Sequence, residues 1–219
     1  EHGRAVRVLL SREDVVRLGP KRPPVAAGVR SDGTGIVRVV RTPGIAEAIR
    51  SYAPALEVEE VDVAGPPTST AARAAGWAEA AVLTAAVRGD PDVALEAPSG
   101  ARAEAVVAGG RIHVRVGCGD PLDDVVLRSY CVGAAHMGLG WVTSEGIAVD
   151  ETGDPHDLTI RSFGILRAHD MPPVDVEIVP DRGGAPVNGS DAVFAAVAAA
   201  AWIDQGCLTD WPTRRLHHR

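Results

Sequence analysis

Lysine, aromatic residues and long apolar runs are all scarce in this sequence. Lys21 is the only lysine, and Phe, Trp and Tyr together make up 4% of the 219 residues. The most apolar run, residues 192–203, is shorter than the roughly 20 residues that a membrane-spanning helix needs, and Asp191 and Asp204 flank it. We therefore expect a buried helix at this run and no membrane association.

Basic charge is also too sparse for a nucleic-acid partner. The chain has 22 Lys and Arg against 29 Asp and Glu, a formal net charge of −7, whereas binding to a phosphate backbone depends on clustered Lys and Arg. The one basic cluster, residues 214–219, is terminal, and we expect it to be a solvated tail. The use of arginine in place of lysine indicates a GC-rich, bacterial genome.

Cysteines are few and widely spaced. Cys118, Cys131 and Cys207 form no CxxC pair and have no histidine partner in the spacing of a metal finger, so we expect no metal site and a reducing, cytoplasmic location. No signal peptide is visible, although the sequence does not begin with Met. Cys131 is expected to be packed in the core rather than reactive.

Strand and helix patterns alternate along the chain and predict an α+β fold with mixed sheets and packed helices. Strands are expected at 4–10, at 25–40 as a hairpin with its turn at Asp32-Gly33, at 56–63, at 103–107 and 112–116 around Gly109-Gly110, and at 148–150, 158–160 and 174–179. Helices are expected at 44–53, 69–87, 125–141 and from Asp191 to Gly206.

The chain is predicted to have two parts and a tail. A stretch rich in small residues and proline, 97–100, is the best linker candidate. It separates an N-terminal α+β part, 1–96, from a C-terminal part, 101–207, and residues 208–219 are expected to form a tail. The helix at 125–141 has many small residues, which indicate that another backbone approaches it closely.

Several segments, in the same order along the chain, resemble signatures of the molybdopterin-binding large subunit of the xanthine dehydrogenase and aldehyde oxidase family. Near the start they are 4–14 and Arg22-Pro23. In the C-terminal part they are the Gly-rich segment 127–141 followed by Glu145, then 154–158, 163–166 and 170–177, and finally Gly189-Ser190-Asp191 with the Ala-rich helix, which resembles the family's Gly-Glu-Pro-Pro loop. Roughly half of the chain is covered, and residues 45–99 match no part of the family.

The resemblance implies a reduced form of the family's fold, with a pterin dinucleotide and molybdenum between two domains, and hydroxylation of an aldehyde, a purine or another heterocycle. The family's glycine-glutamine loops, which hold the pterin phosphates and the molybdenum oxo group, have only a weak counterpart in Arg41-Thr42-Pro43-Gly44. The family's subunits are also several times longer. A molybdopterin dinucleotide is therefore expected only if a partner completes the site, and no cofactor otherwise.

Asp191 occupies the position of the family's catalytic glutamate, the general base that activates a metal-bound hydroxyl. Aspartate is shorter by one methylene, which withdraws its oxygens by roughly 1.5 Å, and a misplacement on the order of 1 Å can cost about 100-fold in rate. The N–H groups at the start of a helix also stabilise a charged carboxylate and make it less basic. An alternative is that Ser190 or Asp191 only caps the helix. Gly189 and Ser190 are the expected cofactor contacts, because free N–H groups there bind anions.

His136 and Glu145 are the other catalytic candidates. Histidine is suited to acid-base work, but His136 is equally compatible with a hydrogen-bonded core position. Glu145, just beyond the Gly-rich helix, is equally compatible with a structural contact. The pairs His156-Asp157 and His169-Asp170 lack a third ligand and predict no metal site.

Three functions remain open from the sequence. The chain is one piece of a split molybdenum hydroxylase that acts on an aldehyde or heterocycle with a larger partner subunit. Alternatively, it is a cofactor-free homologue that catalyses isomerisation, cyclisation or lyase chemistry on a small molecule of secondary metabolism, in a pocket lined by His136, Trp141 and Glu145 near Asp191. The third interpretation is a non-catalytic assembly module. The expected partners are a small-molecule substrate and either the larger subunit or further copies of the chain.

Overall fold

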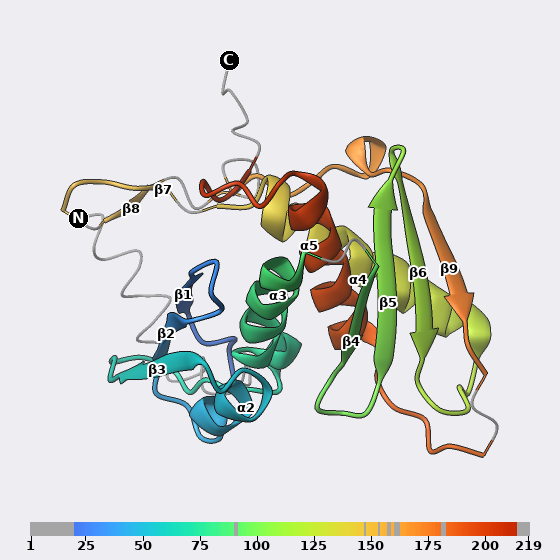
Figure 1. Cartoon of the computed structure of the whole chain (residues 1–219), viewed down its shortest axis with the longest axis horizontal. Helices are drawn as coiled ribbons and strands as arrows, with labels where there is room; N and C mark the ends of the chain where they lie inside the picture. Colours follow the sequence, from blue (N-terminus) through green and yellow to red (C-terminus); the bar gives the residue numbers. More distant parts are fainter. Residues whose placement is uncertain are drawn as a thin grey trace. The chain divides into compact units, whose positions relative to one another are not determined.

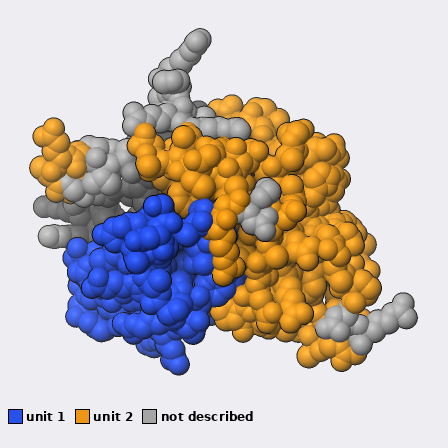
Figure 2. Space-filling view, viewed as in Figure 1, with its two compact units in different colours: residues 1–87 blue, residues 88–219 orange. Residues whose placement is uncertain are grey.

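Two compact units, residues 1–87 and 88–219, make up the chain in the computed structural model (Figure 2). The structure describes residues 20–89, 92–146, 148–152, 154–156, 159, 163–180 and 183–213. Each unit combines a mixed sheet with helices, so the α+β class predicted from the sequence is confirmed. The strand predicted at residues 4–10 lies outside the described residues.

The first unit contains a three-stranded sheet. Its strands are β1 (Val25–Val29), β2 (Gly35–Val40) and β3 (Leu56–Val61). The pair β1 and β2 is antiparallel, and the pair β2 and β3 is parallel. The strands predicted at 25–40 and 56–63 are therefore confirmed.

Local chemistry accounts for the two connections of this sheet. At the β1–β2 turn, the Asp32 carboxylate accepts the Thr34 N–H at 2.9 Å, and Gly33 has a φ of 85°, which suits glycine. The parallel pair is joined by α2 (Ile45–Tyr52), which packs against β3 and buries Ile49 completely. The helix predicted at 44–53 is confirmed.

The helix predicted from residue 69 begins later than expected. Residues 72–74 form a short 3-10 turn with two left-handed residues, and the regular helix is α3 (Trp77–Arg88). Gly76, directly before it, has a φ of 82°. The buried carboxylate of Glu79 accepts the Gly76 N–H at 2.8 Å and pairs with Arg22 at 2.5 Å. This contact fixes where α3 begins, and it involves a residue far away in the sequence.

The second unit contains a four-stranded sheet with the order β4-β5-β6-β9 (Figure 1). The strands are β4 (Val93–Glu96), β5 (Arg102–Ala108), β6 (Arg111–Gly117) and β9 (Val174–Ile178). The first three pair antiparallel and β9 pairs parallel with β6. The hairpin predicted around Gly109-Gly110 and the strand predicted at 174–179 are confirmed.

Residues 97–100, predicted as a linker, form the tight turn between β4 and β5. The Ala97 N–H donates to the Ala101 carbonyl at 2.8 Å, continuing the ladder of the two strands. The predicted N-terminal part, 1–96, included the residues of β4. In the structure β4 pairs with β5 of the second unit, and its buried side chains belong to that sheet. The limits 1–96, 101–207 and 208–219 remain predictions about folding units.

Two helices cover one face of this sheet. They are α4 (Asp124–Thr143) and α5 (Ser190–Asp204); α5 packs against β4, β5 and α4, and α4 also packs against β9. Every residue of α5 from 192 to 201 is buried. The buried side chains of β5 include Ala103 and Ala105. Small side chains on both elements let the backbones approach closely.

The opposite face of the sheet is exposed and carries charged side chains. Arg115 on β6 pairs with Glu104 on β5 at 2.6 Å and with Glu177 on β9 at 3.2 Å, and Arg111 pairs with Asp175 at 3.0 Å. Exposed ion pairs of this kind add little stability. The charged side chains indicate that this face of the sheet contacts solvent.

Two small elements complete the described part of the second unit. A two-stranded ribbon joins β7 (Ala148–Val149) to β8 (Pro155–His156), and residues 168–170 form a 3-10 turn. The strand predicted at 148–150 is confirmed in β7. The strand predicted at 158–160 falls mostly outside the described residues.

Residues 208–213, predicted as the start of a tail, lie against the end of α4. The Trp211 ring contacts those of Trp141 and Trp202 edge-on, with centroid distances of 5.3 and 5.2 Å. Its Nε1–H donates to the Trp141 carbonyl at 2.7 Å, and the Thr213 N–H donates to the Val142 carbonyl at 2.9 Å. The terminal cluster 214–219 lies outside the described residues. Within the described ranges, no helix has the length and apolar character needed to cross a bilayer.

Candidate functional site

The Gly-rich helix α4 is the element around which the candidate residues are arranged. On one face it touches α5, since a Cβ added to Gly138 would lie 2.6 Å from the Phe194 carbonyl oxygen and 3.3 Å from the Ala198 nitrogen. Only glycine permits this separation. Trp141 stacks on Phe194 nearby, with ring centroids 5.2 Å apart. The close backbone approach predicted from the small residues of this helix is confirmed.

His136 lies half-buried on α4 and is held by a backbone group. Its Nε2 is 2.7 Å from the Leu166 carbonyl oxygen. Because a carbonyl can only accept, Nε2 must carry the proton, and in the neutral ring Nδ1 then holds the free lone pair. The bond also ties α4 to the segment 163–166.

Glu145 follows α4 and folds back on it. Its N–H donates to the Gly140 carbonyl at 2.8 Å, and its Oε1 lies 2.8 Å from the point that a Cβ on Gly140 would occupy. The Cβ of Leu166 is 3.6 Å from the same point. His136 and Glu145 thus share the flank of α4 that faces Leu166, and the absent side chain of Gly140 leaves room for the carboxylate.

Asp191 lies in the first turn of α5 and is half-buried. The helix begins one residue earlier, at Ser190, whose N–H donates to the Asn188 side-chain oxygen at 2.9 Å. Gly189 packs toward the sheet, since a Cβ there would lie 3.0 Å from the Val116 side chain. The Asn188 side chain therefore binds one N–H group at the start of this helix. The sequence interpretation did not single out Asn188, although an Asn just before a helix is a known capping signal.

Two of the three catalytic candidates, His136 and Glu145, lie on the same flank of α4. Two residues along a helix correspond to a rotation of about 200°, so Gly138, which touches α5, lies on the face of α4 opposite to His136 and Gly140. Glu145 lies on the side of His136. Asp191 belongs to α5, the helix that packs against the other face. Asp191, His136 and Glu145 remain predictions as catalytic residues.

The loop before α5 is hydrogen-bonded to its own chain at several points. The Val187 N–H donates to the Cys118 carbonyl at 3.0 Å, and the Asp120 N–H donates to the Gly184 carbonyl at 3.0 Å. The Ser190 N–H is bound by Asn188. The N–H groups of Val187 and Ser190 are therefore not free for phosphate oxygens. Gly189 and Ser190 remain predicted cofactor contacts, but other donors would have to complete such a site.

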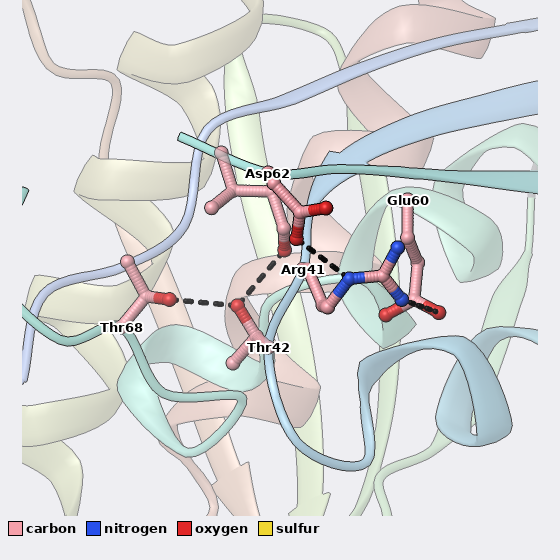
Figure 3. Close-up of polar contacts among 6 residues, drawn as sticks. Arg41, Thr42, Glu60, Asp62 and Thr68 are labelled. Atoms are coloured by element: carbon pink, nitrogen blue, oxygen red, sulfur yellow. Dashed lines mark hydrogen bonds and ion pairs between the residues drawn. The ribbon is translucent and has the colours of Figure 1, made fainter. Parts of the chain in front are cut away.

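The Arg41-Thr42-Pro43-Gly44 segment of the first unit also binds its own chain (Figure 3). Thr42 is 2% exposed, and its hydroxyl oxygen lies 2.7 Å from that of Thr68. Arg41 donates to the Asp62 carboxylate at 2.7 Å, and this hydrogen bond raises the pKa of the arginine. The polar groups of this segment hold strand ends together, which indicates a structural role.

The cysteines of the second unit are packed rather than poised for chemistry. Cys118 and Cys131 are both free and buried. Burial raises the pKa of the Cys131 thiol to about 11, with a further contribution from Cys118. The expectation that Cys131 is a core residue is confirmed. No three His, Cys, Asp or Glu side chains lie together as a metal site in the part of the chain that the structure describes.

Comparison with known proteins gives similarity at the level of structure alone. No protein-family model matches the sequence, and neither does any curated protein. A Cu,Mo carbon monoxide dehydrogenase in its carbon monoxide reduced state is similar with 13% identity and a TM-score of 0.41, over 88% of this chain and 36% of that one. Quinoline 2-oxidoreductase from Pseudomonas putida 86 is similar with 11% identity and a TM-score of 0.38, over 82% of this chain and 34% of that one.

A third similar structure is the aldehyde oxidoreductase from Desulfovibrio desulfuricans ATCC 27774, with 18% identity and a TM-score of 0.31, over 83% of this chain and 28% of that one. All three are molybdenum hydroxylases. The chain spans only about a third of the length of the structures that it matches. TM-scores this low do not establish a shared fold.

Proposed function

We propose that this chain is one part of a molybdenum hydroxylase of the xanthine dehydrogenase and aldehyde oxidase family, and that a larger partner subunit holds the pterin cofactor. The observation that carries the proposal is the spatial arrangement of the segments that resemble family signatures. Four such segments, separate in the sequence, meet at α4 within the second unit.

Each meeting is a specific contact. The Gly-rich segment touches the Ala-rich helix where Gly138 meets the backbone of Phe194. It is bound to the segment 163–166 by His136. The segment 170–177 includes β9, whose Val176 carbonyl accepts a hydrogen bond from Arg128 on α4. These contacts are the arrangement expected of segments retained from a common site.

A partner subunit accounts for what this chain lacks. Two N–H groups of the loop before α5, those of Val187 and Ser190, are used within the chain, so further donors for the pterin phosphates would come from elsewhere. The pterin cofactor supplies the molybdenum-dependent hydroxylation when it is bound. For the chain itself we propose that the carboxylate of Asp191, in the first turn of α5, is the proton acceptor in the reaction with the substrate. The substrate class is an aldehyde or an aromatic heterocycle.

The cofactor-free enzyme is the less favoured function. It needs His136, Trp141 and Glu145 to line an open pocket beside Asp191. His136 is bound to Leu166, Trp141 lies against Phe194 and Trp211, and the Glu145 carboxylate lies against Gly140. These contacts show the three side chains packed within the second unit.

The test is elemental analysis for molybdenum and an assay for pterin on protein purified from its native host, with identification of any larger chain in stoichiometric association. We expect molybdenum, pterin and a larger subunit together. A folded protein that is free of metal and of any partner would refute the proposal.

Variants of Asp191 in the purified complex then test its role. Asp191→Asn is expected to reduce kcat by at least 100-fold, because it removes the proton acceptor while it keeps the shape. Asp191→Glu is the matched control, which keeps the charge and restores the missing methylene, and it should retain or raise kcat. Unchanged kcat in both Asp191→Ala and His136→Ala would instead favour the assembly module.

A further inference from the structure

Residues 208–213, which we call the strap, run from the end of α5 to the end of α4 and bury little of their surface. Residues 208–211 are exposed, and Pro212 and Thr213 are half-buried. Segments with few buried contacts open at a lower free energy than the core of a domain. The strap is therefore expected to separate from α4 before the unit as a whole unfolds.

We propose that the strap and residues 140–146 open together as one local unit, so that the position of Glu145 depends on whether the strap is bound. The closed strap keeps the last turn of α4 formed, and the open strap lets this turn unwind. The proposal is independent of the proposed function, because it requires neither a cofactor nor a partner subunit.

The strap supplies hydrogen-bond donors to the end of α4. The last four carbonyls of a helix have no partner within the helix, and α4 ends at Thr143. The Trp141 carbonyl accepts the indole N–H of Trp211 at 2.7 Å. The Val142 carbonyl accepts the N–H of Thr213 at 2.9 Å. Release of the strap leaves both carbonyls to water and weakens the last turn.

The backbone of Glu145 is held by the same turn. The N–H groups of Ser144 and Glu145 both donate to the Gly140 carbonyl, at 2.9 and 2.8 Å. The strap also touches the next residue, since a Cβ added to Gly146 would lie 3.2 Å from the Cδ of Pro212. When the last turn unwinds, the Gly140 carbonyl moves away from these N–H groups. Glu145 then loses its backbone bond to α4.

The other end of the strap is held by α5. The indole N–H of Trp202 donates to the Leu208 carbonyl at 3.0 Å, and the Cys207 N–H donates to the Trp202 carbonyl at 2.9 Å. Trp202 belongs to α5, whose residues 192–201 are all buried. The strap is therefore expected to leave α4 and to remain attached to α5.

Hydrogen exchange of the full chain, followed by NMR at single amides, tests the proposal. We expect the amides of Ser144, Glu145 and Thr213 to share one opening constant, at least 10-fold above that of the most protected amides of β6. Trp211→Ala should raise the exchange of these three amides at least 10-fold, because it removes contacts that only the closed strap makes. If Trp211→Ala does not fold, Trp211→Phe removes the indole donor alone and should raise their exchange about 5-fold, as expected for one net hydrogen bond.

A change at the other end of α4 is the matched control. The Asp123 carboxylate caps the first turn of α4, and this turn stays formed while the strap is open. Asp123→Ala should therefore leave the exchange of Ser144, Glu145 and Thr213 unchanged. The same variant should raise the exchange of the β6 amides, which exchange only when the whole unit unfolds.

The coupling should also act in the reverse direction, from the end of α4 to the strap. Gly146→Ala should raise the exchange of the Thr213 amide at least 3-fold, since the new methyl group crowds the ring of Pro212. Gly133→Ala adds the same group to α4 at a point where no atom lies within 4 Å, and it should leave the exchange of Thr213 unchanged.

Four outcomes would each overturn the proposal. In the unaltered chain, the amides of residues 144–145 exchange as slowly as those of β6. In Asp123→Ala, both sets of amides respond alike. In Trp211→Ala, only the amide of Thr213 responds. In Gly146→Ala, the amide of Thr213 does not respond.

Discussion

The two halves of α4 have similar apolar content but differ in how far they are buried. The first half exposes Val125, Val126 and Tyr130, whereas the second half buries Gly138, Leu139 and Val142. Three elements cover the second half: α5 on one face, the Leu166 segment on the other, and residues 208–213 at the end. Apolar character alone therefore does not decide burial. What decides it is which other segments reach the helix.

The difference between the two halves is tested most directly by adding a methyl group to each of them. In Gly138→Ala the new Cβ would lie 2.6 Å from a backbone oxygen that cannot turn away, so we expect destabilisation of about 3 kcal/mol, at the upper end for overpacking. Gly133→Ala meets no atom within 4 Å and should stabilise by roughly 0.5–1 kcal/mol, since alanine favours helices. Urea denaturation measures both. Equal effects would contradict the stated helix contact.

The end of the second half is tested by Trp211→Ala. This change removes two ring contacts and the hydrogen bond to the Trp141 carbonyl. Since Trp211 is 38% exposed, we expect a loss of about 2 kcal/mol, below that of a fully buried tryptophan. Trp211→Phe keeps a ring and should lose about 1 kcal/mol. A thermal midpoint unchanged in Trp211→Ala would show that residues 208–213 do not stabilise the unit.

The first half is tested at its cap. The Asp123 carboxylate accepts the N–H groups of Val125 and Val126 at 2.8 and 3.0 Å. Asp123→Ala should cost about 1 kcal/mol of the free energy of unfolding, and Asp123→Asn much less. Chemical denaturation measures the difference. The same loss in both variants would assign the effect to charge rather than to capping.

The smallest expected effect concerns the thiol on the buried side of α4. Because burial raises the pKa of Cys131 to about 11, little thiolate forms at pH 8, and alkylation by iodoacetamide should modify the half-buried Cys207 first. The unfolded thiol loses its proton near its usual value of 9.0. Its contribution to stability is therefore present below that pH and is lost as the pH rises through about 11. Peptide mass spectrometry after timed alkylation checks the order, and early modification of Cys131 would contradict it.

Local patterns of the sequence were enough for most of the elements. The β5–β6 hairpin follows from alternating residues around Gly109-Gly110, and α4 and α5 follow from their composition and flanking residues. The start of α3 could not be predicted in this way, because it depends on Glu79 binding both Gly76 and the distant Arg22. Residues 97–100 connect β4 and β5, which their composition could not specify, since the same residues suit a linker and a hairpin turn.

For the candidate site, the order of residues along the chain was enough to find a Gly-rich helix, an Ala-rich helix, and Asp191, His136 and Glu145 near them. Folding in three dimensions was needed to place His136 and Glu145 on the flank of α4 that faces Leu166 and to pack α5 against Gly138. A helix presents all of its faces in every stretch of four residues, so spacing along the chain does not tell which face a distant segment will cover.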